Sequence, residues 1–183
     1  SDASGDHVTR WSTVTRSGQF TEADLADRPV EERERRDWSL TWAVALDPAS
    51  GAAVLPPDVP RVVHAPTPSD DELHVPALLI GTFPLSPDRR RIAFGPATDV
   101  LLDAAADAYT ELLRRVAAPA TWDLIPLERL SGDEFDARFR ARVAALLPDL
   151  PFLQTVTGVS LSPRDAVLVE GGDPQLRGVP VLH

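Results

Sequence analysis

The 183-residue sequence contains neither cysteine nor methionine. Without cysteine the chain has no disulfide, no thiol nucleophile and no zinc–thiolate site, which agrees with a cytoplasmic protein. Methionine is missing even as an initiator, so we expect the sequence to be a piece of a longer protein. Its polar and acidic start, SDASGDH, lacks the apolar core of a secretory signal peptide. We expect residues 1–7 to be a disordered tail or a tag remnant.

Positive charge and long apolar runs are also scarce. Asp and Glu number 28 against 18 basic residues, all of them arginine, which gives a net charge of −10. Such a surface repels nucleic acid and anionic membranes, because both bind basic proteins by releasing counterions. No apolar run approaches the roughly 20 residues that span a bilayer. We therefore expect a cytoplasmic domain whose partners are neither nucleic acid nor membrane.

The residues that are present indicate a globular α/β domain. Hydrophobic residues make up 43% and charged residues 25% of the chain, the usual balance for a domain with a core. Alternating apolar residues predict strands at 8–16 and 38–46, with a helix between them that Asp27 could cap. These elements form a small amino-terminal strand–helix–strand unit. The proline-rich stretch 47–76 predicts a long surface loop with a short strand at VVHA and an acidic tip at residues 70–72.

Two long amphipathic helices follow this loop. Apolar side chains at helical spacing predict one helix at about 97–116 and another at 131–147. Ser131 and Glu134 have the spacing of a capping box at the start of the second helix. Alternating strands and helices favour a single domain over residues 8–183, a two-layer α/β sandwich in which a mixed sheet packs against the two helices. The remaining strands are expected at ALLIGTF with RIAF as its hairpin partner, and at WDLIPL, FLQTVTG and AVLVEG.

Complete catalytic, metal and nucleotide motifs are missing from the sequence. It has no GxSxG elbow, no GxGxxG loop and no GxxxxGK[ST] loop. His64 and His74 flank the acidic residues 70–72, a set from which a small hydrolase could be built. These histidines lack the helical spacing of a metal pair, and solvated or capping roles explain them more simply. The acidic residues lack the alternating ligands and glycine turn of a calcium loop. We therefore expect no catalytic residue and no metal site in this chain.

Three consecutive arginines, Arg89, Arg90 and Arg91, follow a proline-bearing turn after the strand expected at 77–83. A guanidinium group binds phosphate through two parallel hydrogen bonds. A basic cluster at a strand end is therefore a candidate anion site in this acidic protein. The alternative is a charged hairpin turn in which Asp88 and nearby acids neutralise the arginines. The residues alone leave both interpretations open.

The stretch VPALLIGTFPLSPDRRRI, residues 75–92, resembles a signature of sacsin-type proteins. In that family an apolar strand runs into an aromatic–small–leucine step and then Ser-x-Asn-Arg-Arg. Asp88 stands where the family usually has asparagine. The wider sequence, from about residue 8 to residue 170, resembles large actinobacterial ATP-binding proteins with a sacsin-like or heat-shock-chaperone-like ATPase domain. The matching positions of the signature are Phe83, Leu85, Ser86, Arg89 and Arg90.

The resemblance implies a non-catalytic middle domain that follows an ATPase domain of the GHKL class. In heat-shock chaperones of this class the middle domain sends an arginine to the γ-phosphate of the nucleotide, and the matching position here is Arg89 or Arg90. This chain lacks the GHKL boxes themselves: it has no Glu-x-x-x-Asn helix, no Asp-x-Gly-x-Gly loop and no glycine-rich lid. The resemblance therefore implies that ATP and Mg²⁺ bind the adjacent ATPase domain of the same polypeptide. This domain would couple nucleotide state to an unknown client or partner protein.

A free-standing interaction module with no link to ATP is the alternative. The predicted strands carry Trp11, Trp38 and Trp42, which could form a docking surface together with the proline-rich loop. Tryptophans in strands are more often part of a core than of an interface. An ATPase domain upstream in the parent gene would favour the middle domain, and a complete short gene would favour the interaction module.

Overall fold

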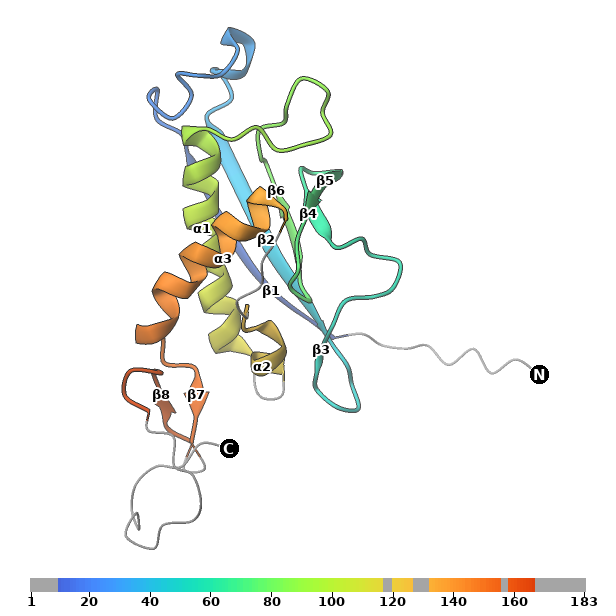
Figure 1. Ribbon diagram of the computed structural model, residues 1–183, viewed down its shortest axis with the longest axis vertical. Helices are drawn as coiled ribbons and strands as arrows, with labels where there is room; N and C mark the ends of the chain where they lie inside the picture. Colours follow the sequence, from blue (N-terminus) through green and yellow to red (C-terminus); the bar gives the residue numbers. More distant parts are fainter. Residues whose placement is uncertain (1–9, 117–119, 127–131, 156–157, 167–183) are drawn as a thin grey trace, which may run out of the picture.

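The computed structural model describes residues 10–116, 120–126, 132–155 and 158–166. This part of the chain is a two-layer α/β fold, in which a mixed six-stranded sheet carries two long helices on one face (Figure 1). The predicted fold class is therefore confirmed. The helices are α1 (Pro96–Arg115), α2 (Ala120–Leu124) and α3 (Glu134–Leu146). The strands of the sheet are β1 (Arg10–Gln19), β2 (Asp37–Leu46), β3 (Ala53–Val54), β4 (Val62–His64), β5 (Pro68–Glu72) and β6 (Leu78–Gly81).

The strand order in the sheet is β1–β2–β6–β4–β5, and β3 lies beside β2. All of these pairs are antiparallel except β4 and β6, which are parallel. β1 and β2 form a continuous ten-residue ladder in which Gly18 faces Trp38. A Cβ atom at Gly18 would stand 2.5 Å from the Trp38 ring. The glycine thus allows the indole to lie across β1.

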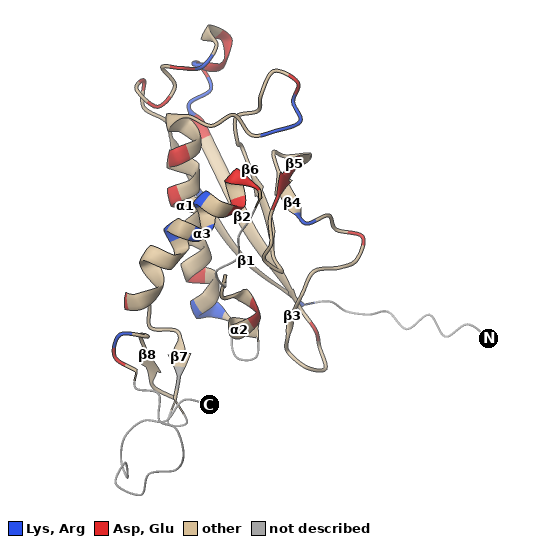
Figure 2. Ribbon diagram, in the orientation of Figure 1, with Lys and Arg blue, Asp and Glu red and all other residues tan. Residues whose placement is uncertain are grey.

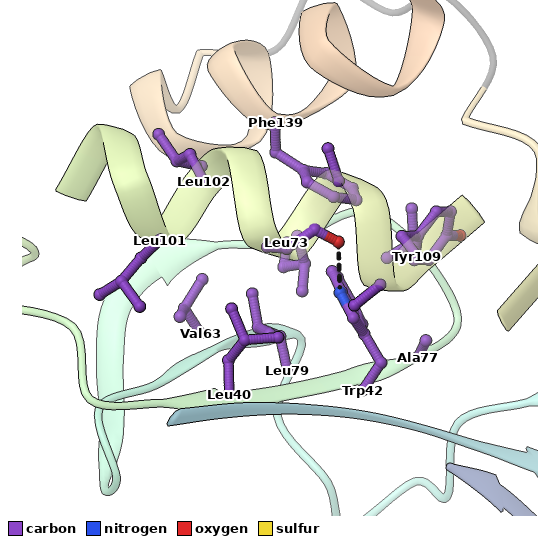
Figure 3. Close-up of a cluster of buried hydrophobic side chains, with 14 of the residues drawn as sticks. Leu40, Trp42, Val63, Leu73, Ala77, Leu79, Leu101, Leu102, Tyr109 and Phe139 are labelled. Carbon is purple, nitrogen blue, oxygen red and sulfur yellow. Dashed lines mark hydrogen bonds between the residues drawn. The ribbon is translucent and has the colours of Figure 1, made fainter. Parts of the chain in front are cut away.

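The core lies between the sheet and the helices and is centred on three aromatic rings. Trp42 of β2, Tyr109 of α1 and Phe139 of α3 contact one another with ring centroids 4.8–5.2 Å apart. All three side chains are fully buried. The indole N–H of Trp42 donates a 2.9 Å hydrogen bond to the carbonyl of Ala105, so β2 is tied directly to α1 (Figure 3). The buried indole N–H of Trp42 is in this way satisfied inside the core.

Helix α1 confirms most of the predicted helix at 97–116. Its buried residues cover more than one face of the helix, because the sheet packs on one side of α1 and α3 packs on another. A residue from a distant segment lies close to the amino terminus of α1. A Cβ atom at Gly95, the residue before the helix, would stand 2.2 Å from Oδ2 of Asp27. Asp27 therefore does not cap a helix in its own segment, and its carboxylate lies at the positive end of the α1 dipole.

Helix α3 is shorter than the predicted 131–147 and has a different cap. Ser131, the predicted capping residue, lies outside the described residues. The helix begins at Glu134, and the side chain of Asp133 accepts hydrogen bonds from the backbone amides of Phe135 and Asp136. Asp133 also accepts a 3.1 Å hydrogen bond from the backbone amide of Glu72, which connects the start of α3 to β5. A short polar side chain at this position supplies the acceptor that the first helical turn needs.

The connection between β1 and β2 contains less helix than the sequence predicts. Only η1 (Val30–Glu32) forms, a single 3-10 turn that follows Pro29 and buries no residue. The strand–helix–strand unit is thus present with a minimal helix. The charged residues 31–36 (EERERR) form no apolar stripe that could pack against the core. A short helix without such packing is marginal in water.

The predicted surface loop at 47–76 contains three strands of the sheet. β4 confirms the short strand at VVHA, while β3 and β5 were not expected. The acidic tip predicted at residues 70–72 is wrong, because this segment is β5 and its side chains alternate. Ser69 and Asp71 are buried, whereas Asp70 and Glu72 face solvent. Burial of an aspartate carboxylate requires a hydrogen-bond donor, and this donor comes from a segment about twenty residues further along the chain.

The short elements after residue 90 also differ from the sequence-based expectation. WDLIPL is not a strand: α2 ends at Leu124, buries Ala120 and leaves Trp122 45% exposed. A strand would have placed Trp122 and Leu124 on one face. RIAF contributes only an isolated bridge between Leu85 and Ile92. FLQTVTG contains β7 (Leu153–Gln154), but its partner is β8 (Ser160–Leu161). AVLVEG lies outside the described residues except for its first alanine.

We expect Phe139→Ala to lower the free energy of unfolding by roughly 3–5 kcal/mol, because it leaves a cavity between two aromatic rings. Denaturant unfolding followed by tryptophan fluorescence measures the loss. Leu146→Ala on the same helix is the matched control. Its side chain is 38% exposed, so its substitution should cost less than about 1 kcal/mol. Equal losses for the two variants would contradict the packing of α3 on the core.

Candidate functional site

The arginine triplet lies in a compact loop between β6 and α1, which we call the arginine loop (residues 84–92). Its ends are closed by backbone hydrogen bonds. The amide of Ser86 donates to the carbonyl of Arg91 over 2.8 Å, and the amide of Ala93 donates to the carbonyl of Pro84 over 2.9 Å. The amide of Arg89 closes a tight turn by donating to the carbonyl of Ser86 over 2.8 Å. The loop is therefore an ordered turn.

A serine and an aspartate hold the interior of the arginine loop. The Ser86 hydroxyl donates a 2.6 Å hydrogen bond to Oδ1 of Asp88, and the same oxygen accepts from the backbone amide of Arg90 at 3.1 Å. The Ser86 hydroxyl oxygen also accepts from the amide of Arg91. The hydrogen bond from Ser86, followed by the one from the Arg90 amide, lowers the pKa of Asp88 below its ordinary value. The carboxylate form of Asp88 therefore stabilises the turn.

Arg89 adopts a left-handed backbone conformation, with φ of 57°. It is the one non-glycine residue in the described part of the chain with positive φ. This conformation costs on the order of 1 kcal/mol for a side chain of this kind. Hydrogen bonds from the amides of Arg90 and Arg91 to the side chains of Asp88 and Ser86 maintain this backbone conformation. Strain of this kind is often found where a protein presents a side chain in one fixed direction.

Strand β5 anchors the arginine loop from outside. The amide of Asp70 donates to the carbonyl of Arg90 over 2.7 Å, and Oδ2 of Asp71 accepts a 2.6 Å hydrogen bond from the amide of Ile92. The Asp71 side chain is on the buried face of β5, and this burial raises its pKa. The acidic strand and the basic loop thus lie side by side at this edge of the sheet (Figure 2).

The three arginines of the triplet differ in their partners. Arg90 forms an ion pair with Asp70, with Nη2 and Oδ2 2.9 Å apart. Arg89 and Arg91 are exposed and have no ion-pair partner among the described residues. Two guanidinium groups on an ordered turn therefore remain available to bind an oxyanion such as phosphate or carboxylate. Of the predicted neutralisation by nearby acids, Arg90 shows a direct ion pair, while Arg91 is attracted to the Asp71 carboxylate without forming one.

The apolar residues of the signature attach the loop to the core. Phe83 is buried and packs edge-to-face against Phe135 of α3, with ring centroids 5.3 Å apart. Leu85 is half-buried against the same core. The carbonyl of Leu85 accepts a 3.2 Å hydrogen bond from the guanidinium of Arg28, which joins the β1–β2 connection to the loop. The sequence pattern did not indicate Arg28, because its contact depends on a segment 57 residues away.

The structure does not assemble the residues of the hydrolase interpretation. His74 lies between Glu72 and Asp136, with ring nitrogens 3.2 Å and 3.4 Å from their carboxylate oxygens. Asp71 points instead to the arginine loop. His64 is in β4, where burial lowers its pKa and its Nε2 atom has no hydrogen-bond partner within the described segments. No group of three or more His, Asp or Glu side chains in the described residues is arranged to hold a metal ion.

The cluster around His74 connects α3 to the sheet. Asp136 is fully buried, accepts hydrogen bonds from the amide of His74 and from Nε of Arg140, and Arg140 in turn donates to the carbonyl of His74. Two of these bonds, to the amide and to the carbonyl of His74, fix the backbone between β5 and β6. The buried ion pair therefore orders the segment that leads into the strand before the arginine loop.

Helices of the described part are all too short or too polar to cross a membrane.

We expect Asp71→Asn to change the pH dependence of stability. Burial raises the pKa of Asp71 in the folded protein, so its contribution to stability is present below the unfolded pKa and is lost as pH rises through the folded pKa. The variant cannot ionise, and it should gain stability relative to the wild type as pH rises from about 4 to about 7. Asp88→Asn is the control with the opposite sign, since the pKa of Asp88 is lowered. Parallel pH curves for wild type and Asp71→Asn, measured by denaturant unfolding, would contradict the burial of this carboxyl.

Comparison with known proteins finds no relative of this chain. No protein-family model, no curated protein and no solved structure matches it. The resemblance to sacsin-like and chaperone-like ATPases therefore depends on the residues quoted above, chiefly those of the arginine loop and the strand before it.

Proposed function

We propose that this chain is a non-catalytic middle domain of a cytoplasmic, chaperone-like GHKL ATPase. In this proposal the arginine loop presents a guanidinium group to the γ-phosphate of ATP, which is bound with Mg²⁺ by the adjacent ATPase domain of the same polypeptide. The domain then couples nucleotide state to contacts with a client or partner protein. The observation that carries the proposal is an exposed, ordered turn in which two of three arginines have no ion-pair partner among the described residues.

The geometry of the loop favours Arg89 over Arg90 as the residue that meets phosphate. Arg90 is paired with Asp70, and its carbonyl accepts from the amide of the same residue. Moving Arg90 to a nucleotide would break that ion pair. Arg89 has no such partner, and its strained backbone is held in place before any ligand binds. A pre-ordered cation loses less conformational entropy on binding than a flexible one.

The anchors of the loop would allow it to transmit a change of nucleotide state from the ATPase domain to this domain. Its position depends on Asp70 and Asp71 of β5 and on Phe83, which packs against α3. A force on the loop would thus act on both layers of the fold. Electrostatic attraction to a nucleotide would be local, because the loop is basic while the chain as a whole carries a net charge of −10.

An interaction module remains the alternative function, and the exposed apolar side chains favour it. The three candidate tryptophans do not form one surface: Trp42 is fully buried and Trp38 packs against the core, whereas Trp11 is 41% exposed. Trp11 and Val54 both pair with Ala45, so they share the face of the sheet opposite the helices. This alternative therefore predicts docking through the sheet rather than through an aromatic cluster.

We expect Arg89→Ala in the full-length protein to reduce ATP turnover. An arginine that meets transition-state charge is worth on the order of 10³ in rate, and one that only orders the closed state is worth less. Nucleotide affinity should change less than turnover, because the ATP pocket lies in the other domain. Arg114→Ala on the exposed side of α1 is the control and should leave turnover unchanged. Unchanged turnover in both Arg89→Ala and Arg91→Ala would leave the loop as a charged turn only.

We also expect this chain alone to bind ATP weakly. The glycine-rich and acidic boxes of a GHKL pocket are missing from its sequence, so calorimetry with Mg²⁺-ATP should show no sub-micromolar dissociation constant. Tight binding by the isolated chain would mean that it holds a nucleotide pocket of its own. The proposal that ATP is bound by the adjacent domain alone would then be wrong, whatever the effect of the arginine variants.

A further inference from the structure

Strand β1 forms one end of the sheet, and its outer edge pairs with no strand in the described residues. The amide of Phe20 donates to the carbonyl of Arg36 and continues the β1–β2 register, so the even-numbered residues of β1 face β2. In an antiparallel ladder the alternate residues then point their amides and carbonyls outward. These outward residues are Trp11, Thr13, Thr15, Ser17 and Gln19.

This edge lacks most of the features that usually prevent strands from pairing, and its charged residues are Arg10 and Arg16. Its ladder with β2 has no bulge over ten residues, and the strand contains neither proline nor lysine. Natural proteins protect exposed edges with such features or cover them with another segment. Within the described residues, the outward carbonyls are contacted only by guanidinium groups: Arg115 donates to Thr13 and Arg16 donates to Thr15. A carbonyl has two lone pairs, so both oxygens can still accept from an added strand.

The side chains along the edge fit a second copy of the same strand. The side chains of these outward residues all lie on the face of the sheet opposite the helices, and none of them is charged. An antiparallel pair centred on Thr15 places Thr15 opposite itself and Thr13 opposite Ser17. Cross-strand pairs of threonine and serine stabilise sheets, whereas like charges opposite each other destabilise them. Self-pairing in this register brings no like charges together on that face.

Charges on α1 select the antiparallel direction. Glu111 is contacted by both Arg16 and Arg115, and Arg115 also reaches the carbonyl of Thr13. Arg115 therefore lies beside Thr13, and Glu111 lies beside Arg16. When Thr13 is opposite Ser17, the Arg115 side chain of one copy comes next to the Glu111 side chain of the other. A parallel pair through the same edge would turn one sheet over and place the two α1 helices on opposite faces, where Arg115 and Glu111 of different copies do not meet.

We propose that two copies of this chain associate through antiparallel pairing of β1, which joins their sheets into one. The inference is independent of the proposed function, because it uses a different edge of the sheet from the arginine loop. Sedimentation velocity from micromolar to hundreds of micromolar concentration should show a species of twice the 19.8 kDa mass of the chain. A monomer over this whole range would overturn the proposal.

A pair of lysine substitutions tests the site of pairing. Thr15→Lys places two ammonium groups opposite each other at the centre of the interface and should weaken the dimer at least about tenfold. Thr41→Lys is the matched control: it adds the same charge one strand away and breaks the same 2.9 Å hydroxyl hydrogen bond between Thr15 and Thr41. It should remain dimeric. Equal behaviour of the two variants would overturn the assignment to β1.

A charge exchange on α1 tests the same interface without altering the strand. Glu111→Arg should weaken the dimer, because it faces Arg115 of the second copy, and Glu111→Arg with Arg115→Glu should restore it. Circular dichroism confirms that each variant is folded. If Thr15→Lys does not fold, this pair of variants decides the question. A double variant that associates no better than Glu111→Arg alone would contradict the antiparallel arrangement.

Discussion

The positions of the two long helices, α1 and α3, depend on the burial of Trp42. Its indole N–H needs an acceptor once it leaves water, and the carbonyl of Ala105 in the middle of α1 supplies it. The close approach that this bond requires is possible because that part of α1 is built of small residues, alanines at positions 104–106. Phe139 also packs against the same indole ring, which places α3. One hydrogen bond and two ring contacts thus set the two layers of the fold.

The arginine loop depends on this core through both of its ends. Phe83 enters it from β6 and packs on Phe135, while α1 starts just after the loop and is held by Trp42. Between these fixed ends, acidic side chains order a basic turn: Asp88 from within and Asp71 from β5 bind backbone amides rather than guanidinium groups. Because these carboxylates bind the backbone, Arg89 and Arg91 form no ion pair within the described residues, although the Asp71 carboxylate attracts Arg91.

The sequence predicted the elements whose pattern is local. The alternation of Trp38, Leu40 and Trp42 indicated β2, and the apolar spacing along 97–116 indicated α1, because each pattern reflects one buried face. It failed for β5, whose burial of Asp71 depends on the amide of Ile92 in another segment. It failed likewise for Asp27, which caps no helix nearby and lies at the start of α1. The triplet itself was visible in the sequence, but the distinction between Arg90 and its neighbours required Asp70 to be placed beside it.

The two candidate surfaces lie at opposite edges of one sheet. The strand order places β1 at one end and β5, which holds the arginine loop, at the other. Pairing through β1 would therefore leave both arginine loops of a dimer uncovered, at the two far ends of a joined sheet. A neighbouring domain could then approach each loop without competing with the second copy. The net charge of −10 on each chain opposes association in general, so a dimer would require local complementarity of the kind that Glu111 and Arg115 provide.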